Sequence, residues 1–303
     1  MKKLLTLSFP AVILALCFSS CLKDECIELQ EMVYLDPVVI PADLFRTDIY
    51  SNPGEALEQA GKIYVWGNLL LINDFEKGIH VVDNRNPIDP QFINFIGIQG
   101  NVDMIVSGSY LYADSYSDLL TIDVSDWMNP RLLHREEDVF NLHGWNEEGL
   151  IVRYDARSEM VEVDCNSNLW RGWDSSSPEI FTNNFSGNSG PSNSPQGIAG
   201  SMARLGITAG HLYGIDNRTL HVFGLENPNQ PDRLNKIKTA WGIETLFPHE
   251  NYLFIGGNRG MYIYDNSNPS APTYLSEFAH ANACDPVFVS GDRAYVTLRD
   301  GVE

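Results

Sequence analysis

The residues that could do chemistry in this chain are scattered rather than grouped into motifs. The sequence has no HExxH metal motif, no glycine-rich phosphate loop, no EF-hand loop and no Gly-x-Ser-x-Gly nucleophile elbow. Its seven histidines are widely separated along the chain. We therefore assign no catalytic residue, no cofactor and no metal, and we favour a protein that is not an enzyme.

Carboxylates recur instead at equivalent places. Asp83, Asp123, Asp164 and Asp265 each close an apolar strand-like run. A residue that recurs once per repeat indicates a repeated turn-capping role. A second set, Asp103, Glu244 and Asp285, precedes other strand-like runs and would bind a cation such as Ca²⁺ if those strands lined one channel. Their alignment shifts by a residue between repeats, so we predict no metal site there. His80 and His221 occupy equivalent strand positions, which favours a structural role for both.

The elements that position these residues form an internal repeat. A strand, a turn of Gly plus a polar residue and a second strand recur, which is typical of a β-hairpin. Gly67 and Gly108 mark the first two turns, 41 residues apart. Equivalent segments are Val65–Leu71, Val106–Tyr112, Thr208–Tyr213 and Val289–Tyr295. A third strand, an Asn-Pro turn and a fourth strand then follow in most repeats. Four strands in about 40 residues predict an all-β protein, a β-propeller of four-stranded blades.

The repeat resembles the LVIVD family, in which an apolar strand ends in Asp and leads to an Asn-Pro turn. Residues 81–87 (VVDNRNP), 121–130 (TIDVSDWMNP) and 263–269 (IYDNSNP) carry the pattern. The resemblance covers Gly61 to the end, except that the third repeat lacks Asn-Pro. It implies a propeller, frequently a bacterial cell-surface lipoprotein, and it implies no particular activity.

The predicted blades are 61–99, 100–139, 140–200 with an insertion, 201–239, 240–280 and a partial sixth, 281–303. We interpret this sixth blade as truncated, and the strand Met32–Ile40 is a candidate to close it. The insertion at 166–200 is rich in Ser, Asn, Gly and Pro. It is either a solvated loop or a binding loop anchored by Trp170, Arg171 and Trp173.

The N-terminal residues have the pattern of a targeting sequence. Lys2 and Lys3 precede an apolar run and two serines, which predicts a signal peptide over residues 1–20. Phe18-Ser19-Ser20-Cys21 resembles the bacterial lipobox, which implies that Cys21 is acylated and begins the mature chain. Residues 21–60 then form a tether and N-terminal extension. We predict an outer-membrane lipoprotein, held by its lipid. The Lys-Asp-Glu run at 23–25 is explained equally by surface export and by a solvated tether.

The net charge of the chain limits its possible partners, and its cysteine content limits its possible disulfides. The 303 residues carry 20 Lys and Arg against 40 Asp and Glu, a net charge of −20. Nucleic-acid binding is excluded, because it depends on cations that neutralise phosphates. Removal of Cys17 with the signal and acylation of Cys21 leave Cys26, Cys165 and Cys284, whose pairing stays open.

These features predict a lipid-anchored propeller that binds a protein or a glycan, at the cell surface. The alternatives are an inward-facing envelope scaffold and a hydrolase or lyase that acts on polysaccharide, which would need paired carboxylates. The ligand, the full number of blades and the oligomeric state do not follow from the sequence.

Overall fold

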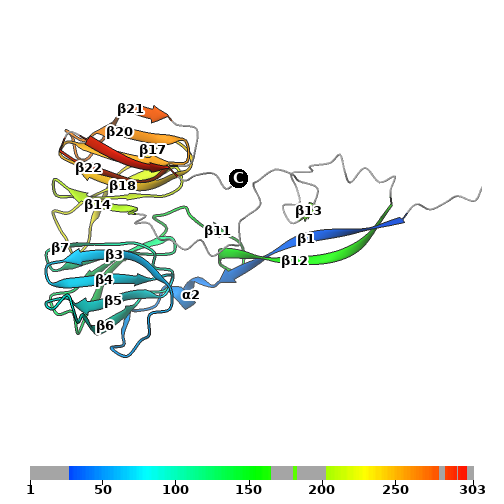
Figure 1. Cartoon of the computed structure of the whole chain (residues 1–303), viewed down its shortest axis with the longest axis horizontal. Helices are drawn as coiled ribbons and strands as arrows, with labels where there is room; N and C mark the ends of the chain where they lie inside the picture. Colours follow the sequence, from blue (N-terminus) through cyan, green and yellow to red (C-terminus); the bar gives the residue numbers. More distant parts are fainter. Residues whose placement is uncertain (1–26, 165–179, 183–202, 280–283, 292, 299–303) are drawn as a thin grey trace, which may run out of the picture. The chain divides into compact units, whose positions relative to one another are not determined.

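The computed structural model describes residues 27–164, 180–182, 203–279, 284–291 and 293–298, and Figure 1 shows them in colour. Their regular secondary structure is almost entirely β-strand, with one short helix, α2 (Ala42–Phe45). No helix in these ranges is long and apolar enough to cross a membrane. The chain divides into two compact units: residues 1–37 with 154–192, and residues 38–153 with 193–303. The second unit contains the repeats.

The second unit contains a series of antiparallel sheets, which we number 1 to 5 in chain order. Sheet 1 consists of β3 (Ala60–Trp66), β4 (Leu69–Asp74), β5 (Gly78–Asp83) and β6 (Gln91–Gly97), with β2 (Tyr50–Ser51) added beside β6. Sheet 2 consists of β7 (Met104–Ser107), β8 (Tyr110–Ser115), β9 (Asp118–Asp123) and β10 (Arg131–Glu136). Sheet 3 consists of β14 (Leu205–Thr208), β15 (His211–Ile215), β16 (Thr219–Gly224) and β17 (Asp232–Lys238). Sheet 4 consists of β18 (Ile243–His249), β19 (Tyr252–Gly257), β20 (Gly260–Asp265) and β21 (Thr273–Ala279). Sheet 5 pairs β22 (Cys284–Ser290) with β23 (Arg293–Leu298).

Local turn chemistry explains the hairpins that open these sheets. Gly67, Gly108, Gly210 and Gly291 all have positive φ, between 58° and 72°, in two-residue turns. A Cβ at any of these four would meet no atom within 4 Å, so the backbone conformation rather than lack of space favours glycine. The hairpins predicted around these glycines are therefore confirmed. Sheet 4 places Glu250, with φ 50°, at the same turn.

The recurring aspartates cap the next turn, as predicted. Asp83 Oδ1 accepts a hydrogen bond from the backbone N–H of Arg85 at 3.0 Å. Asp123 and Asp265 accept the equivalent bonds from the N–H groups two residues ahead, at 2.9 and 2.8 Å. The side chain of Asp164 lies outside the described residues. Each carboxylate thus satisfies a backbone donor where the chain leaves its third strand.

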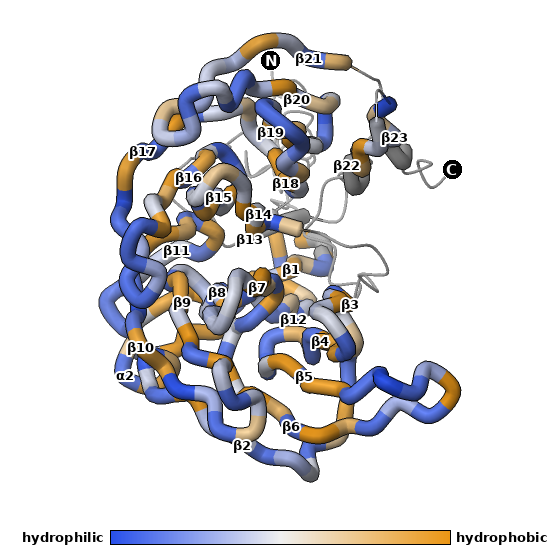
Figure 2. Tube along the Cα trace, turned by 90° about the vertical axis from the view of Figure 1, so that its left-hand side faces the viewer, coloured by the Kyte–Doolittle hydropathy of each residue, from blue (hydrophilic) through white to orange (hydrophobic). Residues whose placement is uncertain are grey.

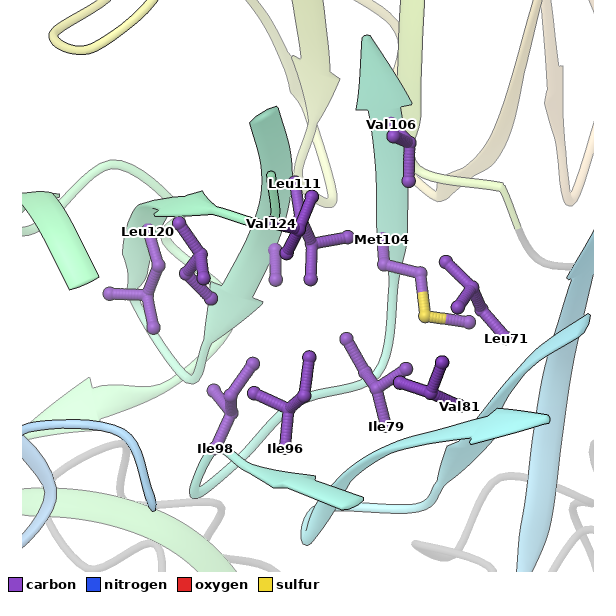
Figure 3. Packing of buried hydrophobic residues seen from close by; sticks show 12 residues of the cluster. Leu71, Ile79, Val81, Ile96, Ile98, Met104, Val106, Leu111, Leu120 and Val124 are labelled. Carbon is purple, nitrogen blue, oxygen red and sulfur yellow. The ribbon is translucent and has the colours of Figure 1, made fainter. Parts of the chain in front are cut away.

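The core lies between facing sheets. One face of sheet 1 packs on sheet 2 through a cluster of fully buried aliphatic side chains, shown in Figure 3. A second cluster joins sheets 2 and 3, with Tyr112 and Leu119 facing Leu205, Leu212 and Phe223. A third joins sheets 3 and 4. Because neighbouring sheets bury their apolar faces against one another, they are the blades of a β-propeller.

The order of the blades differs from the prediction in one place. The first strands of successive sheets contact each other in the sequence β3, β7, β14, β18 and β22. Figure 2 shows sheets 1 to 4 following one another in that order. Since β7 contacts β14 directly, the described residues within 140–200 do not form a blade between sheets 2 and 3. Sheet 3 is the blade predicted at 201–239.

The described part of that segment builds another sheet. It contains β11 (Gly144–Trp145) and β12 (Leu150–Asp164), and the strand order is β11, β12, β1 (Ile27–Ile40), β13 (Ile180–Thr182). The strand predicted at Met32–Ile40 therefore exists within β1, but it does not close the last blade: Met32 pairs with Thr182. With 15 residues, β12 is much longer than the blade strands, which have four to seven.

The first unit consists, in its described part, of the remaining lengths of β1 and β12 together with β13. Figure 1 shows β1 and β12 as long neighbouring strands. Arg157 Nε lies 3.1 Å from Asp36 and Nη1 lies 2.9 Å from Glu159. The guanidinium also stands over the Tyr34 ring at 4.9 Å. These contacts are exposed, so they stabilise the ribbon only slightly.

Candidate functional site

Two polar clusters in the second unit combine groups that could do chemistry. The first, the Asp103 cluster, is buried where sheets 1, 2 and 3 meet. Asp103 Oδ1 accepts hydrogen bonds from Lys62 Nζ at 2.5 Å and from the Met104 N–H at 2.7 Å. Its Oδ2 accepts from the N–H groups of Arg204 and Leu205, at 2.5 and 2.8 Å. One carboxylate thus joins three blades, and all four of its bonds are internal to the protein.

Asp114 and two asparagines extend this cluster. Asp114 Oδ1 accepts from the N–H groups of Val102 and Asp103 and from Asn101 Nδ2, at 2.7 to 2.9 Å. Asn73 Nδ2 donates to Asn101 Oδ1 at 2.9 Å. Burial raises the pKa of Asp114 to about 6, although the charge of Arg204 and the backbone donors act in the opposite direction. These side chains replace missing backbone hydrogen bonds at the ends of the inner strands, so the cluster is structural.

The three acidic residues considered as a cation site lie on or beside strands of three different sheets. The Asp103 carboxylate is already hydrogen-bonded to Lys62 and to three backbone N–H groups. Glu244 lies on β18 in another sheet, and the side chain of Asp285 lies outside the described residues. Within the part of the chain that the structure describes, no group of three or more His, Cys, Asp or Glu side chains could hold a metal ion.

The two equivalent histidines have different surroundings. His221 Nε2 lies 3.0 Å from Asp216 Oδ2, a hydrogen bond in a buried pair. Burial disfavours the charge on Asp216, but His221 and two backbone donors bring the pKa of Asp216 down to about 2. His80 Nε2 lies 3.5 Å from Asp74, makes no hydrogen bond, and its ring packs against Phe92 and Phe95. Both rings are buried core groups, as predicted, but only His221 is hydrogen-bonded at Nε2.

The second cluster surrounds an open cavity of about 440 Å³. Its walls come from five places: the residue after α2, the turn between β8 and β9, the segment after β10, β11 and β17. The polar and aromatic lining residues are Arg46, Ser117, Asp138, Phe140, Asn141, His143, Trp145 and Lys236. A cavity of this size falls in the range of small-ligand sites. We call it the Trp145 cavity.

Arg46 is the most constrained group in the cavity. Its Nε and Nη2 each bond a different oxygen of Asp118 at 3.0 Å, and Nη1 and Nη2 reach Glu137 and Asp138 at 2.8 Å. Burial lowers the pKa of Arg46, but the bonds and charges of these three carboxylates outweigh it and raise that pKa overall. The guanidinium also stands 5.3 Å from the Trp145 ring. Its charge is therefore matched, and its plane is fixed against the indole.

Of the other lining groups, Trp145 and Lys236 are free to meet a ligand, whereas the His143 ring is hydrogen-bonded to the Ile151 backbone and packs edge-on against Tyr116. The residue Trp145 is 45% exposed. Burial, together with the charge of Arg204, lowers the pKa of His143, so its ring is neutral at pH 7. Among the described residues, no hydrogen bond or ion pair engages the Lys236 ammonium, and only its backbone N–H is bonded. The cavity therefore offers an aromatic face, mixed donors and acceptors, and one uncommitted cation.

The functional residues predicted from the sequence are not among those that the structure describes. Trp170, Arg171 and Trp173 lie outside the described residues, and so does Cys21. The sequence analysis did not predict the cavity, because Arg46 precedes the insertion at 166–200 in the sequence and Lys236 follows it. No sequence motif therefore contains both residues. A signal existed at residues 141–146, Asn-Leu-His-Gly-Trp-Asn, where the repeat pattern breaks down beside two polar aromatic residues.

The fold is that of a propeller-like repeat protein, and the Trp145 cavity is its candidate binding site. The chain carries the LVIVD repeat: the family model matches residues 100–135 and 248–279. These matches contain two of the three segments on which the predicted resemblance was based, so that prediction is confirmed. No curated protein matches the chain.

Several solved structures are similar at low identity. A protein of unknown function from Desulfotomaculum acetoxidans is 12% identical, with 85% of this chain and 82% of that chain covered and a TM-score of 0.38. The Cps50 (Swd1) β-propeller domain of Myceliophteria thermophila is 14% identical, with 76% and 75% covered and a TM-score of 0.35. BamB from Moraxella catarrhalis is 9% identical, with 90% and 94% covered and a TM-score of 0.30. Similarities this low carry no argument about function.

Proposed function

We propose that this protein is a lipid-anchored, non-enzymatic propeller of the bacterial outer membrane, facing the cell surface, and that it binds a glycan in the Trp145 cavity. One observation carries the ligand class. An exposed indole stands beside a fixed guanidinium, a carboxylate and an amide in a concave site. A sugar ring presents C–H groups on its face and hydroxyl groups around its edge, and the cavity offers a partner for each.

The chemistry of the lining matches that of a sugar edge. The Asp138 carboxylate, 60% exposed, bonds Arg46 through one oxygen and has further lone pairs for hydroxyl donors. Asn141 supplies an amide that both donates and accepts. The indole supplies a large apolar face that is rigid, because the Arg46 guanidinium stands against the same ring. Ordered donors and acceptors reduce the entropy lost when the ligand binds.

A glycan array probed with the purified soluble domain tests this proposal, followed by titration calorimetry on the best ligand. The variant Trp145→Ala should weaken binding by about 5- to 150-fold, because stacking of a ligand ring on one aromatic side chain contributes about 1–3 kcal/mol. Trp241→Ala is the matched control, because Trp241 is 56% exposed and does not line the cavity. Binding to a protein that needs Trp145, with no glycan bound, would overturn the glycan assignment.

The anchor and the location are supported by the signal peptide and by the lipobox-like Phe18-Ser19-Ser20-Cys21. In cells that express the whole protein, Cys21→Ala should move it from the membrane fraction to the soluble fraction. Protease added to intact cells should degrade the wild-type protein. Protection from protease would contradict surface display and favour the inward-facing scaffold.

A further inference from the structure

Most cations around the Trp145 cavity are already neutralised by neighbouring carboxylates. Arg46 is shared among Asp118, Glu137 and Asp138, and Arg135 lies 3.3 Å from the same Asp118. Arg233, on β17, is paired with Glu136. These ion pairs attach the segment after β10 to the neighbouring elements. They leave no net positive charge for a ligand.

Lys236 is the exception. The residue lines the cavity from β17, and no carboxylate among the described residues pairs with its ammonium. His143 lines the same cavity, but its lowered pKa keeps it neutral at pH 7, so it does not share this role. An uncommitted ammonium in a concave site attracts an anionic group.

We propose that the Trp145 cavity selects an acidic carbohydrate, whose ring lies on the Trp145 indole and whose carboxylate pairs with Lys236. This inference rests on the proposed glycan-binding function and names its substrate class. The ligand is a uronic-acid type of sugar: it has a C–H face for the indole, hydroxyl groups for Asp138 and Asn141, and one carboxylate for the ammonium. A neutral sugar of the same shape leaves the Lys236 ammonium unused.

The negative charge of the whole chain does not prevent this. At about 0.15 M salt the screening length is about 8 Å, so distant carboxylates act weakly on a ligand in the cavity. A contact ion pair persists at that salt, although its strength decreases as salt is added. The preference for the acid should therefore shrink between low and high salt.

The test compares oligogalacturonate with its methyl ester, which keeps the ring and the hydroxyl groups but removes the charge. Calorimetry at about 0.15 M salt should show the free acid bound about fivefold more tightly, the effect of one partly exposed ion pair. Lys236→Gln should bring the ratio to about one. Lys238→Gln is the matched control, because Lys238 lies on the same strand and does not line the cavity. It should leave the ratio unchanged.

The outcomes separate this inference from the proposed function. Equal binding of acid and ester by the wild-type protein, or an unchanged ratio in Lys236→Gln, would overturn the acidic specificity and leave glycan binding in place. If Trp145→Ala weakens binding of both forms while Lys236→Gln abolishes only the preference, both are supported. Failure of every glycan on the array and of both galacturonate forms would overturn the proposed function itself.

Discussion

The Asp103 cluster and the Trp145 cavity use the same residue types in opposite ways. In the Asp103 cluster, one carboxylate is fully buried and makes four internal hydrogen bonds. In the cavity, Trp145 and Lys236 are exposed and their side-chain polar groups have no such set of partners. Burial with complete pairing stabilises the propeller, whereas exposure in a concave site leaves binding capacity for a ligand.

The largest expected effect is on the buried cluster. Asp103→Ala removes the partner of a Lys62 side chain that is 7% exposed, and it leaves two backbone donors from the start of sheet 3 unpaired. We expect a loss of about 3–5 kcal/mol in the free energy of unfolding, measured by urea denaturation. Asp232→Ala, at an exposed position on β17, is the control and should change it by less than about 0.5 kcal/mol. If Asp103→Ala lowered the free energy of unfolding by less than about 1 kcal/mol, the Asp103 cluster would not stabilise the propeller as proposed.

A pH effect from the same cluster is the next largest. The pKa of Asp114 is about 6 in the folded protein against 3.8 for the free group, so the folded state binds this proton more tightly. The stability that this proton contributes is complete below pH 3.8 and is lost as pH rises through 6. Between pH 5 and 8 the wild-type protein should lose about 1.4 kcal/mol relative to Asp114→Asn. Parallel pH profiles for the two proteins would show that Asp114 does not titrate in this range.

The repeated turn should contribute less. Asp123→Ala removes the acceptor for the Ser125 N–H and the exposed ion pair with Arg131, so we expect a loss of about 0.5–1 kcal/mol. Asp83→Ala, at the same turn in sheet 1, should cost about the same. Because the two turns belong to different sheets, the double variant should show additive losses in thermal or urea unfolding. Strong non-additivity would mean that the turns do not act independently.

The smallest stability change is expected in the cavity. Trp145→Ala removes an exposed ring whose contacts are Arg46 and Phe45, so the free energy of unfolding should change by less than about 1 kcal/mol. Glycan binding should nevertheless weaken by about 5- to 150-fold. A variant that binds normally but unfolds easily would reverse the comparison and make Trp145 a structural residue.

The sequence by itself determined the repeating parts of this protein. Some turn signals depend only on neighbouring residues: a glycine in a two-residue turn, and an aspartate that accepts a hydrogen bond from the N–H group two residues ahead. Gly67 and Asp83 therefore predicted their turns without knowledge of the rest of the chain. Apolar runs beside these turns predicted strands, and the repeat spacing of about 40 residues predicted blades of a propeller.

Only the tertiary structure decided which strands become neighbours. The third repeat unit keeps a strand ending in Asp164, yet its long strand β12 pairs with β1, and sheet 3 packs directly after sheet 2. Asp103 finds its donors 101 and 102 residues away, and the cavity combines Arg46, Trp145 and Lys236 from distant segments. Local propensity acts over a few residues, whereas sheet order and side-chain convergence depend on how apolar faces are buried together, which a local pattern does not encode.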